Sequence, residues 1–147
     1  MADQSFHDLV AQAIQAIDQG NTMMALMYLE DAAKVGDSPA LKSYLGFCLA
    51  KERMQFKKGV ALCREATILE PVNSQYWLNL GRVCLLARQK RPAIEAFRRG
   101  LKVNCNKQIV DELKRLGLRK TPVFSNLERT HFLNRQVGRV LDQLNLR

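Results

Sequence analysis

A pattern of small and large residues recurs three times along this chain at a fixed spacing, from Ala25 to Gly59 to Ala93. Each copy has a large side chain between two small ones, at intervals of four and then three residues. Self-similarity at a period of about 20–50 residues is the signature of a repeat protein, whose units bury their apolar sides by stacking on one another. The three copies are Ala25, Leu29 and Ala32; Gly59, Cys63 and Ala66; and Ala93, Phe97 and Gly100.

A second element precedes each of the last two copies. Leu45–Gly46 recurs as Leu80–Gly81, and the only tryptophan, Trp77, lies one helical turn before the latter pair. A glycine inside a helix costs about 1 kcal/mol relative to alanine. The missing side chain at Gly81 therefore indicates a second helix that passes very close.

These residues resemble the tetratricopeptide repeat (TPR), whose signature places Trp, Leu-Gly, an aromatic, Gly, Ala, a large apolar residue, Ala and Pro within about 34 residues. The resemblance covers about residues 5–107 and implies an all-α fold, a right-handed α-solenoid of three helix-turn-helix repeats. The departures are Cys84 for the aromatic, Arg88 for the turn glycine, Gly100 for the second alanine and Cys105 for the closing proline. The matching residues are Trp77, Leu80, Gly81, Ala93 and Phe97 in the third copy, Leu45, Gly46, Gly59, Ala66 and Pro71 in the second, and Gly20, Ala25 and Ala32 in the first.

The resemblance also sets the expected organisation of the chain. The repeats are placed at about 5–38, 39–73 and 74–107, with helices near 4–19, 22–35, 39–53, 56–70, 74–87 and 91–104. A polar-backed helix at 107–116 is expected to cap the stack. A basic connector, 117–129, leads to an amphipathic C-terminal helix within 130–147, for which docking on its own chain and a tail-mediated homodimer are both open.

The same resemblance places the close helix contact. Gly81 on the first helix of the third repeat is expected to meet the second helix, with Ala93 facing it from the other side. Small residues at such a crossing let helix axes approach to about 8–10 Å. Trp77 and Phe97 are expected to fill the spaces between these contacts as core residues.

Few residues suggest chemistry. The four cysteines, Cys48, Cys63, Cys84 and Cys105, include no CxxC pair. We therefore expect buried, reduced, structural thiols, with metal or redox roles as the alternatives. The two histidines lie far apart in the sequence without a motif around either. The sequence thus predicts a non-enzymatic protein that needs no cofactor and no metal.

The resemblance implies a protein-interaction module in which the first helices line a groove for a peptide or helix. Some relatives clamp the free carboxylate terminus of a chaperone with Lys, Asn, Asn, Lys and Arg. The matching positions here are Val10, Ile14, Tyr44, Gln75 and Asn79, of which only Asn79 gives a polar match. We therefore expect a groove that prefers an apolar or mixed segment over a carboxylate terminus. The expected groove residues are Val10, Ile14, Tyr44, Phe47, Gln75, Leu78, Asn79 and Arg82.

Charge suggests a second class of partner. The chain carries a net charge of +9, and residues 57–147 hold 19 basic but only seven acidic residues. Such a footprint favours an acidic protein partner or association with an acidic membrane surface. Nucleic acid is the less favoured alternative, since no aromatic-rich strip accompanies the charge. The absence of a signal or an 18-residue apolar run predicts a cytoplasmic protein with no membrane span. The basic patch comprises Arg88, Lys90, Arg91, Arg98, Arg99, Lys114, Arg115, Arg119 and Lys120.

Overall fold

The computed structural model describes residues 2–117, and these residues hold seven helices. The predicted tail helix within 130–147, the connector beyond Gly117, the basic residues Arg119 and Lys120 and the tail-mediated homodimer all lie outside the described residues. The helices are α1 (Ala2–Asp18), α2 (Thr22–Val35), α3 (Pro39–Arg53), α4 (Phe56–Leu69), α5 (Ser74–Leu86), α6 (Lys90–Val103) and α7 (Lys107–Arg115).

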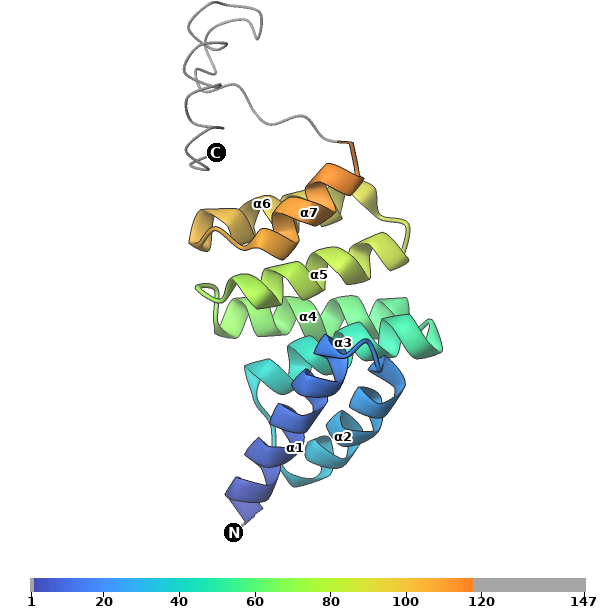
Figure 1. The fold of residues 1–147 in the computed structure, drawn as a ribbon, viewed down its shortest axis with the longest axis vertical. Helices are drawn as coiled ribbons and strands as arrows, with labels where there is room; N and C mark the ends of the chain where they lie inside the picture. The colour runs from blue at the N-terminus through green and yellow to red at the C-terminus, as the bar shows by residue number, and fades with distance from the viewer. Residues whose placement is uncertain (1, 118–147) are drawn as a thin grey trace, which may run out of the picture. The chain divides into compact units, whose positions relative to one another are not determined.

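Helices α1 to α6 form three hairpins that follow one another in chain order (Figure 1). Within each hairpin the two helices pack together, as α1 with α2, α3 with α4, and α5 with α6. Between hairpins, α3 packs on α2 and α5 packs on both α3 and α4, whereas α1 barely touches α3. These helices belong to one compact unit that ends at Leu113, and a second unit begins at Lys114.

The repeat period of the sequence appears directly in the backbone. The turn inside each hairpin contains one residue with positive φ: Gly20 at 81°, Met54 at 55° and Arg88 at 58°. Positive φ is unstrained only for glycine and costs other residues about 1–2 kcal/mol. Arg88 therefore occupies a position at which the turn requires a left-handed conformation, as its alignment with the turn glycine predicts.

The closest approach of two helices is between α3 and α4. A Cβ atom added to Gly46 would lie 2.7 Å from the carbonyl oxygen of Gly59, and one added to Gly59 would lie 2.6 Å from that of Gly46. These separations are far shorter than any normal van der Waals contact. Both glycines are therefore required for the two backbones to touch.

At the equivalent point in the third hairpin, a ring replaces the backbone contact. A Cβ on Gly81 would lie 2.2 Å from the nearest atom of Phe97, and the next two nearest atoms also belong to that ring. Phe97 is a buried core residue, as expected, but its ring, rather than Ala93, supplies the atoms nearest to Gly81. Phe97 is fully buried and occupies the room that the missing side chain of Gly81 leaves.

The capping helix explains the departure at Gly100. A Cβ on Gly100 would lie 2.5 Å from Cδ1 of Ile109 on α7 and 2.9 Å from Cβ of Trp77. Ile109 is fully buried, so α7 covers the end of α6 at this point. Asn106 caps the helix, because its side chain accepts hydrogen bonds from the backbone N–H groups of Gln108 and Ile109. A glycine replaces the usual alanine because α7 needs the space.

We expect Gly81→Ala to destabilise the protein, although alanine favours helix over glycine by about 1 kcal/mol. The added methyl group must displace the buried ring of Phe97, and overpacking of this kind costs about 1–3 kcal/mol. Urea denaturation followed by circular dichroism measures the change. Combining it with Phe97→Leu should cost less than the sum of the two single changes, because the smaller side chain relieves the clash. A stabilised Gly81→Ala protein would contradict the observed packing.

We expect Arg88→Gly to stabilise the protein by about 1 kcal/mol, because glycine adopts the positive φ of this turn without strain. Thermal unfolding monitored by circular dichroism measures the effect. Ala87→Gly is the matched control, since Ala87 has a φ of −77° that suits any residue. There the glycine adds only flexibility to the unfolded chain and should lower the melting temperature. The same sign of change in both variants would contradict the assignment.

Candidate functional site

The predicted groove residues lie on α1, α3 and α5, and we call this side of the unit the first-helix face. Ile14, Gln75 and Arg82 are half-buried there. Val10, Tyr44 and Phe47 are buried, with 7–9% of each residue exposed. Leu78 and Asn79 have 0% and 1% exposed, so the expectation that they line an open groove is corrected: they belong to the helix packing.

Asn79 has a structural role in the contact between α3 and α5. Its side-chain amide donates a hydrogen bond of 3.0 Å to the hydroxyl of Ser43, which is fully buried. The backbone carbonyl of Ser43 accepts a 3.3 Å hydrogen bond from the thiol of Cys63 on α4. A buried amide already paired in this way is not available to bind a carboxylate, because releasing it would leave Ser43 unsatisfied.

The charged groups of the first-helix face gather around one aromatic ring. The Lys51 ammonium and the Arg82 guanidinium lie 5.8 and 5.9 Å from the centroid of Phe47, within the range of cation–π contacts. Arg82 also donates a 2.9 Å hydrogen bond to Glu112 on α7. The face therefore carries two cationic side chains over a buried aromatic ring: Lys51 is exposed, and Arg82 is paired with Glu112.

Burial raises the pKa of several tyrosine and cysteine side chains inside the unit and favours their neutral forms. Burial, together with the carboxylate of Glu70, raises the pKa of Tyr76 to about 12, and burial beside Asp18 raises the pKa of Tyr44. Burial raises the pKa of Cys48 to about 12 and that of Cys63 further still. Thiols held in the neutral form are poor nucleophiles and poor metal ligands. The described residues include no group of three or more His, Cys, Asp or Glu that could hold a metal ion.

The prediction for the cysteines needs one correction. Cys48, Cys63 and Cys84 are buried and free, as expected, but Cys105 is exposed. It lies between Asn104, which caps the end of α6, and Asn106, which caps α7, so it stands in a short connection rather than in the helix packing.

The described members of the predicted basic patch are all exposed: Arg88, Lys90, Arg91, Arg98, Arg99, Lys114 and Arg115. Arg99 is not a free charge, because its guanidinium donates a 2.7 Å hydrogen bond to Glu95 one turn earlier on α6. Arg91, Arg98 and Lys102 follow one another at intervals of seven and four residues, which places them along one side of α6. Among the residues up to Leu113, two members of the patch, Arg91 and Arg98, therefore form a stripe on α6 together with Lys102, whereas Arg88 lies in the turn before that helix.

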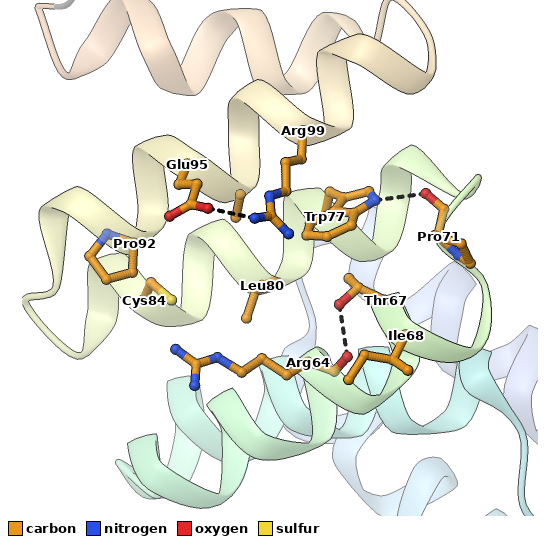
Figure 2. A pocket seen from close by; sticks show the side chains of 11 residues that line it. Arg64, Thr67, Ile68, Pro71, Trp77, Leu80, Cys84, Pro92, Glu95 and Arg99 are labelled. Atoms are coloured by element: carbon orange, nitrogen blue, oxygen red, sulfur yellow. Dashed lines mark hydrogen bonds and ion pairs between the residues drawn. The ribbon is translucent and has the colours of Figure 1, made fainter.

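A pocket of about 470 Å³ opens on the other side of α5 from the first-helix face (Figure 2). At about 3.6 residues per turn, the stripe of Trp77, Leu80 and Cys84 lies roughly opposite that of Gln75 and Arg82. We call this cavity the α4–α6 pocket, because α4 and α6 form its walls and α5 forms its floor. Its lining residues are Arg64, Thr67, Ile68, Pro71, Trp77, Leu80, Cys84, Pro92, Glu95, Ala96 and Arg99.

Trp77 is held at one end of this pocket. Its indole N–H donates a 2.8 Å hydrogen bond to the carbonyl oxygen of Pro71, and the Arg99 guanidinium lies 5.6 Å from the ring centroid (Figure 2). The prediction that Trp77 is a filler between helix contacts is corrected in part. Its Cβ packs on Gly100, but the residue is only half-buried and its ring lines an open cavity.

Sequence reasoning missed this pocket, although a signal for it is present. Ile68 lines the pocket and is 77% exposed. The residues one repeat period before and after it are Lys34 and Lys102. Ile68 is thus apolar and exposed where the other two repeats carry lysine. This difference indicates that the surface around Ile68 is unlike the equivalent surfaces of those repeats.

No protein-family model matches the chain, and no curated protein sequence matches it. Solved structures do. The second TPR domain of human RPAP3, solved in complex with the HSP70 peptide SGPTIEEVD, matches at a TM-score of 0.62 and 16% identity, over 81% of this chain and all of that one. The Sgt2 TPR domain from Aspergillus fumigatus matches at a TM-score of 0.59 and 15% identity, over 85% of this chain and 91% of that one.

The chain has the tetratricopeptide-repeat fold. The prediction of an all-helical TPR architecture is confirmed by these matches, in which the helices pair as they do here. Both neighbours are non-enzymatic TPR domains. A third match is the TPR region of an enzyme, an O-GlcNAc transferase from Thermobaculum terrenum, at a TM-score of 0.62 and 19% identity over 71% of this chain but only 20% of that one. No helix within residues 2–117 is long and apolar enough to cross a membrane.

Proposed function

We propose that this TPR unit is a protein-interaction module, without enzymatic activity, that binds a peptide or a helix of a partner protein along its first-helix face. Support comes from the fold, since TPR neighbours include domains solved with bound chaperone peptides. It also comes from the half-buried side chains of Ile14, Gln75 and Arg82, which leave polar and apolar groups accessible on this face.

The cluster around Phe47 is the observation that carries the proposal. An aromatic ring covered by two cationic side chains resembles the composition of binding hot spots, which are rich in aromatic residues and arginine. Lys51 is exposed, so it can move aside or pair with an incoming acid at little cost in stability. The cluster favours a segment that combines apolar and acidic side chains.

Binding of a free carboxylate terminus is not part of this proposal. Of the five positions that hold the clamp in some relatives, three carry the apolar or aromatic residues Val10, Ile14 and Tyr44. Asn79, the one polar match, is buried and hydrogen-bonded to Ser43. No cation stands at any of the five positions, so a terminal carboxylate would be buried without a charged partner.

We expect Lys51→Glu to remove the partners of the first-helix face. Affinity capture from native cytosol with the 147-residue chain, quantified by mass spectrometry, measures the loss, which should be at least fivefold for a partner bound through the Phe47 cluster. Lys58→Glu makes the same charge change at another exposed position and is the matched control. Each captured protein is then tested by calorimetry with purified components. Equal capture by the two variants would refute binding at this face.

We expect the peptide SGPTIEEVD to bind with a Kd weaker than about 1 mM, because the clamp cations are missing. Isothermal titration calorimetry with the free-acid peptide and with its C-terminally amidated form measures this directly. The two forms should behave alike. Micromolar binding of the free acid that is lost on amidation and on Asn79→Ala would show that a carboxylate clamp exists.

A second candidate function is the binding of nucleic acid or another polyanion. The observation that favours it is the stripe of Arg91, Arg98 and Lys102 on α6, none of which forms an ion pair with another described residue. Such a stripe supplies affinity for phosphates that falls steeply with salt. It lacks an exposed aromatic platform for bases, because Arg99 covers one face of Trp77.

A further inference from the structure

The α4–α6 pocket differs in chemistry from the same place one repeat earlier. There, Lys42 stands four residues before Gly46, as Trp77 stands four residues before Gly81. Lys42 donates to Asp37 at 2.7 Å and to Glu65 at 2.6 Å. The counterparts of these two acids, one repeat period later, are Pro71 and Arg99. Lys42 and Trp77 thus make equivalent contacts in successive repeats. Each contacts the loop before its own helix and the second helix of its own hairpin.

Lys42, in the second repeat, makes these contacts through ion pairs. Trp77, in the third repeat, makes them through its indole ring. The side chain of Lys42 is only 15% exposed between its two carboxylates, so that site is satisfied and polar. Trp77 instead presents its ring to a cavity whose other walls include Leu80 and Ala96, with the exposed Ile68 at the rim. An apolar cavity of this size falls within the range of about 300–1,000 Å³ that ligand sites occupy.

Arg64 supplies an uncommitted charge at the edge of the pocket. Its guanidinium makes no ion pair with any residue in the described range 5–117. Burial raises the pKa of the Cys84 thiol, and the positive charge of Arg64 opposes that rise in part. Glu30, its counterpart one repeat period earlier, is paired through both oxygens with Arg53 at 2.6 and 2.9 Å. The other two charges of the lining, Glu95 and Arg99, neutralise each other. Among the described residues, the pocket therefore has one unpaired positive charge beside an apolar floor.

We infer that the α4–α6 pocket is a second binding site, separate from the first-helix face, for a segment of a partner protein in which an apolar side chain is flanked by Asp or Glu. The apolar side chain fills the cavity over Trp77 and Leu80, and the acid pairs with Arg64. Tryptophan and arginine are both enriched among the residues that contribute most to binding at protein interfaces.

The chemistry of the pocket favours a peptide over a nucleic acid. Arg99 already lies over the ring of Trp77, so one face of the ring is not free to stack on a base. An apolar side chain needs no free ring face for stacking, so this obstacle does not affect it.

The test begins with selection against the 147-residue chain. Random 12-residue peptides displayed on phage are expected to be enriched for a large apolar residue flanked by Asp or Glu. The strongest peptide is synthesised with acetylated and amidated ends, so that no terminal charge contributes. Its binding is followed by calorimetry and by the fluorescence of Trp77, which is the only tryptophan in the chain. Failure to enrich such peptides would overturn the inference.

Variants then locate the bound peptide. Arg64→Glu should weaken binding at least tenfold, and Ile68→Ser at least threefold, while Lys58→Glu on the same helix should change it less than twofold. All three positions are exposed, so the fold is not at risk, and circular dichroism verifies this. Replacing the acid of the peptide with Lys should abolish binding to the wild type and restore it to Arg64→Glu. Equal effects of Arg64→Glu and Lys58→Glu would overturn the inference.

Two further arms separate this site from the others. Lys51→Glu, on the first-helix face, should leave the selected peptide bound. If Lys51→Glu releases the peptide and Arg64→Glu does not, the pocket is not the site, and the proposed function of the first-helix face stands alone. A fluorescent random single-stranded oligonucleotide is titrated in parallel at near-physiological salt. Arg64-dependent binding of the oligonucleotide, with no peptide bound, would refute the inference in favour of nucleic acid.

Discussion

The contact between the backbones of α3 and α4 sets the geometry on which the rest of the unit depends. Gly46 and Gly59 each leave room for the carbonyl oxygen of the other, so no side chain of any kind fits between the helices. The third hairpin solves the same problem differently, since Gly81 accommodates the ring of Phe97. Helix α5 packs on both helices of the second hairpin. The separation of α3 and α4 therefore sets the position of α5 and of the two binding surfaces that lie on its opposite sides. One surface bears the Phe47 cluster and the other the α4–α6 pocket.

The repeats share their frame but not their surfaces. The turn positions Gly20, Met54 and Arg88 keep the same left-handed backbone although only the first is glycine. Conformation is therefore retained even where the residue that favours it has been lost. Surface positions have diverged instead: an ion-paired Lys42 in one repeat corresponds to a hydrogen-bonded Trp77 in the next. Divergence of this kind, on a frame that cannot change, is how repeat proteins acquire distinct binding sites.

The fold could be predicted from the sequence because its main determinants are small residues at a fixed period. The spacing of Gly46, Gly59 and Gly81 indicates close helix packing. Gly46 and Gly59 lie where two backbones touch, whereas Gly81 leaves room for the ring of Phe97. The site was harder to predict, because a repeat pattern identifies the side of a helix but not how deeply its neighbours cover it. Leu78 and Asn79 are placed on the correct helix yet are buried in the packing. The α4–α6 pocket joins residues from three helices, and no spacing along one helix reveals such a cavity.

Helix α5 is fixed in place from three directions, and this bears on whether its two surfaces act together. Asn79 is bonded to Ser43 on α3, Trp77 to the carbonyl of Pro71, and Arg82 to Glu112 on α7. A partner that binds either surface would contact a helix that is already positioned, so the entropic cost of ordering this helix on binding would be small. Because these three hydrogen bonds favour one position of α5, we expect binding at one proposed surface to change the affinity of the other only slightly. The two surfaces are then suited to holding two partners at once, on opposite sides of one helix.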